Sequence, residues 1–323
     1  MDTIRLVTPS CGSVFLEQRE AMPPGHGRGT SSVPGNDFMF DKSQYELIDF
    51  GQGRRLDRFG KFLLDRPCQM ANGLPRQNDT AWENADAIYS GAGAGEGNWR
   101  SSAGMPLAWT IGHNGSTFEL KLTDFGHVGL FPEHAVNWDW ITHQIRSSGE
   151  NLKVLNLFAY TGGATIAAVA GGGEVVHVDA AQNAVLWARR NTQASEMAHA
   201  PIRWITEDVR KFVKREIKRG NKYHGVVLDP PSYGHGPKGE VWKLQEHLPD
   251  LLEMCAELTA HDRRFLLLSC HTTGVDPSDL ESMLHDSMGN LSHGKMESGG
   301  LAIQAADGRQ MPSGIATRWS VIK

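Results

Sequence analysis

From Asn151 onward, short apolar runs alternate with segments of helical pattern, and this alternation constrains the fold more than any other feature. The runs at 152–158, 174–179, 202–208, 224–230 and 264–270 have the length of buried strands. Short buried strands separated by helices predict a doubly wound, mostly parallel α/β sheet. Two late runs, near 299–305 and 316–322, are joined by "ADGRQMPSGI", which is too short for a helical crossover. We therefore expect seven strands, the last two forming a C-terminal antiparallel hairpin.

The chain before this alternation contains a leader, a small domain and one further helix. Residues 1–44 read as an irregular leader, because 21–37 are rich in Pro, Gly and Ser. Residues 45–125 carry short, broken strand patterns between turns, so we expect a small β-rich domain there. A helical pattern follows at 132–149, and we place the α/β domain at 126–323.

Composition excludes several classes of protein. The net charge of −5 over 323 residues does not suit a general polyanion binder. Two local basic stretches, 53–61 and 211–222, remain candidates for contact with RNA phosphates, although a solvated helix face explains the second equally simply. There is neither a signal peptide pattern nor an apolar run of membrane-spanning length. Four scattered cysteines without a CxxC pair predict no metal site and no disulfide framework, and favour the reducing cytoplasm.

Polar residues gather where the expected strands end. The first strand is followed by the turn "FAYTGG" (158–163), and the next ones end in Asp179, Asp208 and Asp229. In doubly wound sheets ligands bind beyond these carboxyl ends. Asp179 suits ribose hydroxyls and Asp208 suits an adenine amino group, although Asp208 is equally well explained as a helix N-cap.

The turn itself indicates which kind of cofactor binds. A dinucleotide site needs G-x-G-x-x-G, so that the pyrophosphate meets a helix N-terminus. The sequence F-A-Y-T-G-G-A-T lacks that spacing and carries an aromatic residue. We therefore disfavour a nicotinamide-dependent oxidoreductase and favour a cofactor without phosphate.

Several motifs together resemble a known family. The strings "VLNLFAYTGGATIAA", "VVHVDA", "TEDV", "VVLDPPSYGHG" and "FLLLSCHT" are similar to those of class I S-adenosylmethionine-dependent methyltransferases, which have a Rossmann-like sheet. The similarity is greatest to bacterial large-subunit ribosomal RNA methyltransferases of the cytosine-5 type. The resemblance implies S-adenosylmethionine as cofactor and RNA, specifically ribosomal RNA, as partner. The cofactor-binding residues it implies are Phe131, Phe158, Tyr160, Thr161, Gly162, Asp179, Ala180, Asp208 and Asp229.

The stretch "LDPPSYGHG" (228–236) is the candidate acceptor site. Two prolines stiffen the chain directly after the strand, and stiffness serves positioning, which supplies much of the rate in methyl transfer. We expect Asp229 to face the planar edge of the acceptor and Tyr233 to stack on its face. Ser232 separates the second proline from the aromatic residue, so the D/N-P-P-Y/F motif of amine methyltransferases does not fit directly. The expected substrate residues are Pro230, Pro231, Ser232, Tyr233, Pro312 and Ser313, the last two from a loop at 306–314 with a turn at Pro312–Gly314.

Two chemistries stay open at this site. Cys270 could add as a thiolate to carbon 6 of cytosine and activate carbon 5, with Asp229 on ring nitrogen 3. Cys270 could equally be a small buried residue that ends a strand, which would leave Asp229 to position a nitrogen or oxygen. His235 and His271 are candidate proton acceptors. The catalytic residues we predict are Asp229, Cys270 and Tyr233.

The sequence also leaves the class of function open. The favoured function is an RNA base methyltransferase, with ribosomal RNA cytosine C5 first. The alternatives are a methyltransferase for a small molecule or protein and a non-catalytic RNA-binding protein. Acids at every strand end count against the last.

Overall fold

The computed structural model describes residues 40–91, 95–236 and 238–322. Most of the predicted leader and Cys11 therefore lie outside the described residues. No helix among the described residues is long and apolar enough to cross a membrane.

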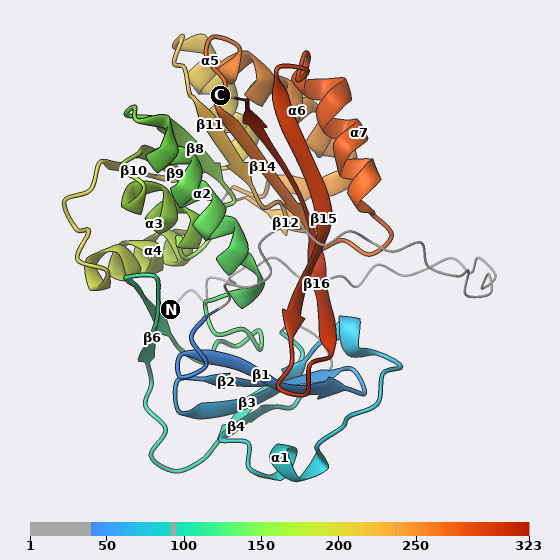
Figure 1. Ribbon diagram of the computed structural model, residues 1–323. Coiled ribbons are helices and arrows are strands. Elements are labelled where there is room, and N and C mark those ends of the chain that lie inside the picture. The colour runs from blue at the N-terminus through green and yellow to red at the C-terminus, as the bar shows by residue number, and fades with distance from the viewer. Residues whose placement is uncertain (1–39, 92–94, 237, 323) are drawn as a thin grey trace, which may run out of the picture.

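The C-terminal part is a seven-stranded sheet in the order β10-β9-β8-β11-β14-β16-β15 (Figure 1). The first five strands in this order run parallel, β16 is antiparallel to β14, and β15 pairs antiparallel with β16. The predicted sheet with its C-terminal antiparallel hairpin is confirmed. The strands are β8 (Lys153–Leu157), β9 (Glu174–Asp179), β10 (Ile202–Thr206), β11 (Gly225–Leu228), β14 (Phe265–Cys270), β15 (Gly294–Gln304) and β16 (Gln310–Val321).

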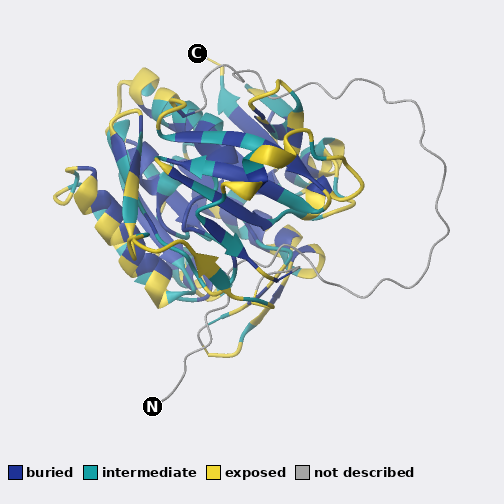
Figure 2. Ribbon diagram, turned by 90° about the horizontal axis from the view of Figure 1, so that it is seen from below, coloured by how far each residue is buried: buried dark blue, intermediate teal, exposed yellow. Residues whose placement is uncertain are grey.

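Helices cover both faces of this sheet because its strands are apolar on both sides. Val154 and Phe265 pack in one core with helices α2 and α3, whereas Leu155 and Leu266 pack in a second core with α5, α6 and α7. The central strands β8, β9, β11 and β14 are buried along almost their whole length, and in Figure 2 buried residues fill the middle of the molecule while exposed residues lie at its outside. The helices are η2 (Pro132–His134), α2 (Ala135–Ser148), α3 (Gly163–Ala170), α4 (Gln182–Ala194), α5 (Val209–Lys218), α6 (Leu244–Thr259) and α7 (Pro277–Met288).

The N-terminal part contains a five-stranded sheet in the order β1-β2-β3-β4-β5 and a separate hairpin, β6–β7. The hairpin packs on α4, where Trp187 Nε1 donates to the Glu119 carbonyl. This hairpin, inside the predicted 45–125 region, thus lies against the α/β part. The elements are β1 (Tyr45–Gly51), β2 (Arg54–Phe59), β3 (Phe62–Pro67), η1 (Gln69–Ala71), α1 (Asp79–Glu83), β4 (Ala87–Tyr89), β5 (Trp99–Ser101), β6 (Trp109–His113) and β7 (Ser116–Leu120).

The β15–β16 hairpin is longer than expected and joins the two parts. Its tip reaches the N-terminal sheet (Figure 1), where Ala305 bridges to Leu47 and Arg309 pairs with Asp49. The predicted turn at Pro312–Gly314 was wrong, because these residues belong to β16 and the turn lies at 305–309. A bulge explains the error: Leu301 pairs with Gly314 and Ala302 with Pro312, so the extra residue between them accommodates the proline in a strand.

A second small hairpin lies between the end of β11 and the start of helix α6. Strands β12 (Tyr233–His235) and β13 (Val241–Lys243) pair antiparallel before α6 begins at Leu244. The glycines at 234, 236 and 239 disfavour helix here, and this hairpin lies at the site described next.

Candidate active site

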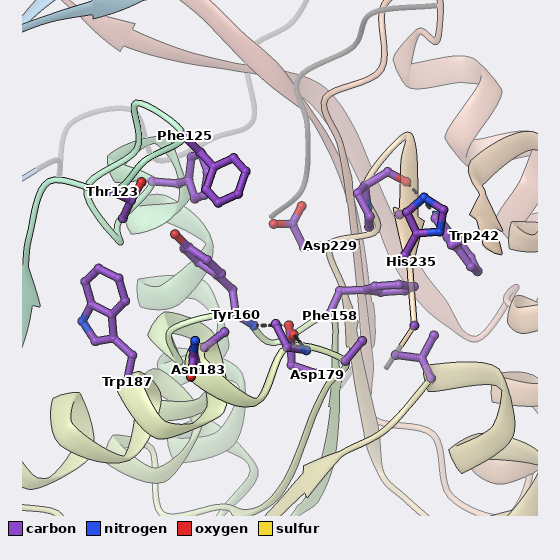
Figure 3. Close-up of a pocket in the computed structure, with 18 of the residues that line it drawn as sticks. Thr123, Phe125, Phe158, Tyr160, Asp179, Asn183, Trp187, Asp229, His235 and Trp242 are labelled. Carbon is purple, nitrogen blue, oxygen red and sulfur yellow. Dashed lines mark hydrogen bonds between the residues drawn. The ribbon is translucent and has the colours of Figure 1, made fainter. Parts of the chain in front are cut away.

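A cavity of about 300 Å³ lies at the carboxyl ends of β8, β9 and β11, beside the start of α5. Figure 3 shows Tyr160, Asp179 and Asp229 inside it, with Phe125 and Trp187 on one side and His235 and Trp242 on the other. The opening is therefore where a doubly wound sheet places its ligand.

The turn after β8 has a strained backbone that aims its amide groups. Phe158 (φ 57°) and Tyr160 (φ 48°) both lie in the left-handed region, which costs non-glycine residues about 1–3 kcal/mol each. Gly162 (φ 90°) follows, and a Cβ there would stand 2.9 Å from the Cβ of Ala188 in α4. The local sequence thus dictates a tight passage from strand to helix, with the Phe158 and Tyr160 side chains in the cavity wall.

Asp179 ends β9 and is held by backbone groups alone. Its carboxylate accepts from the backbone N–H of Tyr160 at 2.8 Å and from that of Ala181 at 2.8 Å. Burial raises the pKa of Asp179, and the two amide bonds only partly offset this. Its side chain lines the cavity, so unused lone pairs of the carboxylate remain available to paired hydroxyl donors.

The other predicted cofactor residues divide into two groups. Phe131, Ala180 and Asp208 line the cavity together with Phe158, Tyr160, Asp179 and Asp229. Thr161 and Gly162 do not line it: the Thr161 hydroxyl is buried and donates to the Gly129 carbonyl at 2.7 Å. Asp208 also caps α5, because its carboxylate accepts from the Lys211 backbone N–H. The helix cap is thus present, and the role toward adenine stays a prediction.

The β12–β13 hairpin forms one wall of the cavity through Gly234, His235 and Trp242. The Trp242 ring packs on Phe158, with ring centroids 4.8 Å apart. Its Nε1–H donates to the Pro231 carbonyl at 2.7 Å. This bond ties the wall to the stiff Pro-Pro stretch.

Hydrogen bonds anchor the stretch after β11 on several sides. The Pro231 carbonyl is taken by Trp242, and the Ser232 carbonyl accepts from the Leu244 backbone N–H. The Ser232 hydroxyl pairs with that of Thr272. Pro231 lines the cavity, Pro230 is buried, and neither Ser232 nor Tyr233 lines it.

Tyr233 is 38% exposed, and its ring lies edge-on to that of His235. Tyr233 does not line the cavity, and its predicted stacking role stays a prediction.

Asp229 is surrounded by side chains from distant parts of the chain. The Ser269 hydroxyl donates to its Oδ1 at 2.7 Å, His134 Nε2 lies 3.4 Å from Oδ2, and His271 Nε2 lies 3.6 Å from Oδ1. Burial would raise the pKa of Asp229, but the two imidazoles and Ser269 hold it well below its usual range. The Asp229 side chain is still 35% exposed, so an ionised carboxylate faces the cavity.

Cys270 ends β14, the strand next to β11, but its side chain faces the core. It is 1% exposed and packs among the leucines of β11 and β14. Burial raises the pKa of its thiol, whereas a nucleophilic cysteine needs a lowered one.

The residues predicted from the last loop lie in β16. Ser313 is buried, and its backbone forms a hydrogen bond with His271, which places it at the border of the Asp229 surroundings. Neither Pro312 nor Ser313 lines the cavity.

The two basic stretches are largely neutralised within the protein. In β2, Arg55 binds Asp57 in the interior and Arg58 pairs with Glu46. In α5, Arg215 pairs with Glu207. Lys211 pairs with Glu240 of the segment before β13.

Several site residues were missed by the sequence interpretation. Residues 121–125, Asn183 and Trp187 line the cavity, and His134 contacts Asp229. No local pattern marks residues 121–125 or His134, because they are distant in sequence from the strand ends that they meet, whereas Asn183 and Trp187 lie in the helix that follows Asp179. The helical spacing of α4, which carries Asn183 and Trp187 on one side, was the one usable signal.

Comparison with known proteins now identifies the family. The family model for S-adenosylmethionine-dependent methyltransferases matches residues 89–270, which include the turn, the acids and the Pro-Pro stretch. The chain belongs to this family. It is therefore a methyltransferase that uses S-adenosylmethionine.

Individual relatives agree with this assignment. A methyltransferase of Agrobacterium tumefaciens has a similar structure, with a TM-score of 0.82 and 34% identity, over 93% of this chain and 99% of that one. The large-subunit ribosomal RNA methyltransferase K/L of Hahella chejuensis is 35% identical over 50% of this chain and 22% of its own. Large-subunit ribosomal RNA methyltransferase I of Escherichia coli O139:H28 is 32% identical over 41% of this chain and 33% of its own. The matched regions thus span about a fifth to a third of these ribosomal RNA methyltransferases.

The cavity fits this cofactor. Its walls combine aromatic rings with four acids, Asp124, Asp179, Asp208 and Asp229, and among the described residues Lys121 is the only lysine or arginine that lines it. A nucleoside with a positively charged sulfonium suits such a lining better than a pyrophosphate does. Asp179 would hold the ribose, Asp208 the adenine, and Phe158 and Tyr160 the methionine side.

Proposed function

We propose that the protein methylates a base of RNA, at a nitrogen atom that Asp229 positions. The cofactor supplies an electrophilic methyl group. The observation that carries the proposal is the Asp229 carboxylate: it is ionised, partly exposed and fixed at the cavity, while the Pro231 and Ser232 carbonyls already accept hydrogen bonds. An ionised carboxylate accepts the N–H of an amino group or ring nitrogen and so orients its lone pair.

RNA as the substrate class is supported by the relatives. Two ribosomal RNA methyltransferases are 35% and 32% identical to this chain over the regions that match. Tyr233 and His235 at the outer side of the cavity offer exposed rings on which neighbouring bases can stack. These exposed rings support the proposal of an extended, planar substrate.

Methylation at cytosine C5 is the competing chemistry within the same substrate class. It requires Cys270 as a thiolate, and the burial and raised pKa of this thiol favour the nitrogen acceptor instead. The same burial makes Cys270 suitable as a small core residue.

The test is methylation of RNA from cells that lack the protein. Purified enzyme and S-adenosylmethionine carrying a labelled methyl group are incubated with total RNA, and the nucleosides are then separated and identified by mass. We expect label in an N-methylated nucleoside, lost in the Asp229→Ala variant and retained in Cys270→Ala. Label in 5-methylcytidine that disappears in Cys270→Ala would replace the nitrogen proposal with the C5 route. No transfer to RNA, together with intact binding of S-adenosylhomocysteine, would refute RNA as the substrate.

A further inference from the structure

The charges that line the cavity are unevenly divided between acids and bases. Asp124, Asp179, Asp208 and Asp229 line it, whereas Lys121 is the only lysine or arginine among the described residues that does so. S-adenosylmethionine carries positive charge on its sulfonium and amino groups and negative charge on its carboxylate. The acids suit the positive groups and the ribose hydroxyls, so Lys121 is the one residue of this lining that suits the carboxylate.

Lys121 comes from the N-terminal part of the chain, directly after β7. Its backbone N–H donates to the Val128 carbonyl at 3.3 Å, which fixes the start of the side chain. Its Nζ lies 4.3 Å from the centre of the Trp187 ring in α4. No carboxylate of the described residues forms an ion pair with this ammonium. Its three N–H donors therefore remain available to an anionic group.

The Trp187 indole is a rigid support for this ammonium. Trp187 is 5% exposed, and its Nε1–H donates to the Glu119 carbonyl at 2.9 Å. The ring packs so closely on Gly129 that a Cβ there would stand 2.1 Å from it. A cation over the face of an indole is attracted by the ring but is not neutralised by it. The ammonium of Lys121 is thus held in place and keeps its charge for a ligand.

The two sides of the cavity have different neighbours. Figure 3 shows Trp187 on one side and Trp242, of the β12–β13 hairpin, on the other, with Asp179 between them. The start of α5 belongs to the hairpin side, because Arg210 Nη2 donates to the Val241 carbonyl at 2.9 Å. The cation therefore lies on the side away from α5.

This arrangement gives the cofactor a direction. Asp208 caps α5, so an adenine bound by Asp208 would lie at the hairpin side. With the ribose at Asp179, the amino-acid chain leaves the other end of the ribose and extends toward Trp187. It passes Tyr160, which lines the cavity. The carboxylate at the end of this chain then faces Lys121.

We propose that Lys121 binds the carboxylate of S-adenosylmethionine, so that the N-terminal part of the chain completes the cofactor site. The cofactor residues predicted from the sequence all follow residue 125, and none of them is a cation. The inference concerns the cofactor alone and is independent of the methyl acceptor. Failure of the RNA proposal would therefore leave it standing.

Binding of three ligands in a calorimeter tests this inference without methyl transfer. S-adenosylhomocysteine has the carboxylate, its decarboxylated analogue lacks only that group, and 5′-methylthioadenosine lacks the whole amino-acid end. We expect wild-type protein to bind S-adenosylhomocysteine about tenfold or more tighter than the decarboxylated analogue, the effect of one hydrogen bond between charged groups. Four acids line the cavity, so without a facing cation the carboxylate would bring no such advantage.

Two variants of Lys121 assign the effect to its ammonium. Lys121→Met keeps the length of the side chain without its charge, and Lys121→Arg keeps the charge. We expect Lys121→Met to lose the preference for S-adenosylhomocysteine over the decarboxylated analogue, with affinity for 5′-methylthioadenosine within about twofold of wild type. Lys121→Arg should retain most of the preference. Lys214→Met, at an exposed position of α5, is the control for loss of one positive charge.

Three outcomes would overturn the proposal. Equal losses of affinity for all three ligands in Lys121→Met would mean that Lys121 only shapes the cavity wall. Unchanged affinity for S-adenosylhomocysteine would remove Lys121 from the cofactor site, and a raised KM for RNA in the same variant would assign its ammonium to a phosphate. Equal affinity of wild-type protein for S-adenosylhomocysteine and its decarboxylated analogue would show that nothing binds the carboxylate. If Lys121→Met does not fold, Lys121→Gln takes its place with the same expectations.

Discussion

The carboxylates at the ends of β9 and β11 occupy corresponding places in the sheet, but their surroundings differ in origin. Asp179 is held by two backbone N–H groups within twenty residues of it, and burial raises its pKa. Asp229 is held by side chains from η2 and β14, and by the residue after β14, and these lower its pKa. Backbone amides position a carboxylate without adding full charge, whereas an imidazolium also fixes its ionisation. We call the part of the cavity around Asp179 the cofactor end and the part around Asp229 the acceptor end. The carboxylate at the cofactor end is therefore positioned by local structure, and the carboxylate at the acceptor end by tertiary structure.

The largest expected effect comes from removing the charge at the acceptor end. Asp229→Asn keeps the shape of the side chain but adds a donor where the acceptor's N–H must bind. We expect kcat to fall by about a hundredfold or more, because positioning is lost, while affinity for S-adenosylhomocysteine stays within about threefold, since Asp229 is one of many lining residues. Single-turnover transfer and calorimetry measure the two quantities. Equal losses in both would mean that Asp229 belongs to the cofactor end.

The reverse pattern is expected for Asp179→Ala. Losing hydrogen bonds to a charged group costs about 1.5–3 kcal/mol, which corresponds to a roughly ten- to hundredfold weaker affinity for the cofactor. Turnover at saturating cofactor should change little. Asp286→Ala, an exposed acid on α7, serves as the control for a simple change of net charge. Unchanged affinity in folded Asp179→Ala would remove this residue from the cofactor site.

The same contrast explains what could be predicted from the sequence. The sheet, its hairpin and the acids at its strand ends follow from apolar runs and turns, which are local signals. The position of His134 could not be predicted, because it lies against Asp229, about a hundred residues away in the sequence. The β12–β13 hairpin was not predicted for a different reason: each of its strands is only three residues long and has no apolar run. The first part of β16 was not predicted, because it contains Pro312, which a strand accommodates only beside a bulge.

A smaller effect should appear in the pH dependence of cofactor binding and of methyl transfer. Asp179 has a raised pKa, so cofactor affinity should weaken as the pH falls through that raised value. Asp229 has a lowered pKa, so turnover at saturating cofactor should persist to lower pH. Calorimetric titration of S-adenosylhomocysteine and kcat, measured between pH 4 and 7, compare the two. A common acid limb for both would show that one group controls both ends.

The smallest effect is expected for Cys270→Ala, which tests whether the acceptor end also contains a nucleophile. The thiol is buried among leucines and its raised pKa keeps it protonated at neutral pH. We expect methyl transfer within about twofold of wild type and a loss of stability on the order of 1 kcal/mol, as for a typical buried substitution. Cys255→Ala, which changes a buried residue of α6, is the matched control for stability. RNA containing 5-fluorocytidine supplies the decisive measurement, because a thiolate mechanism would trap a covalent complex with the native protein and none with Cys270→Ala. Such a complex would mean that RNA binding frees and ionises a thiol that the unliganded fold keeps buried, and that the two ends of the cavity differ in chemistry as well as in construction.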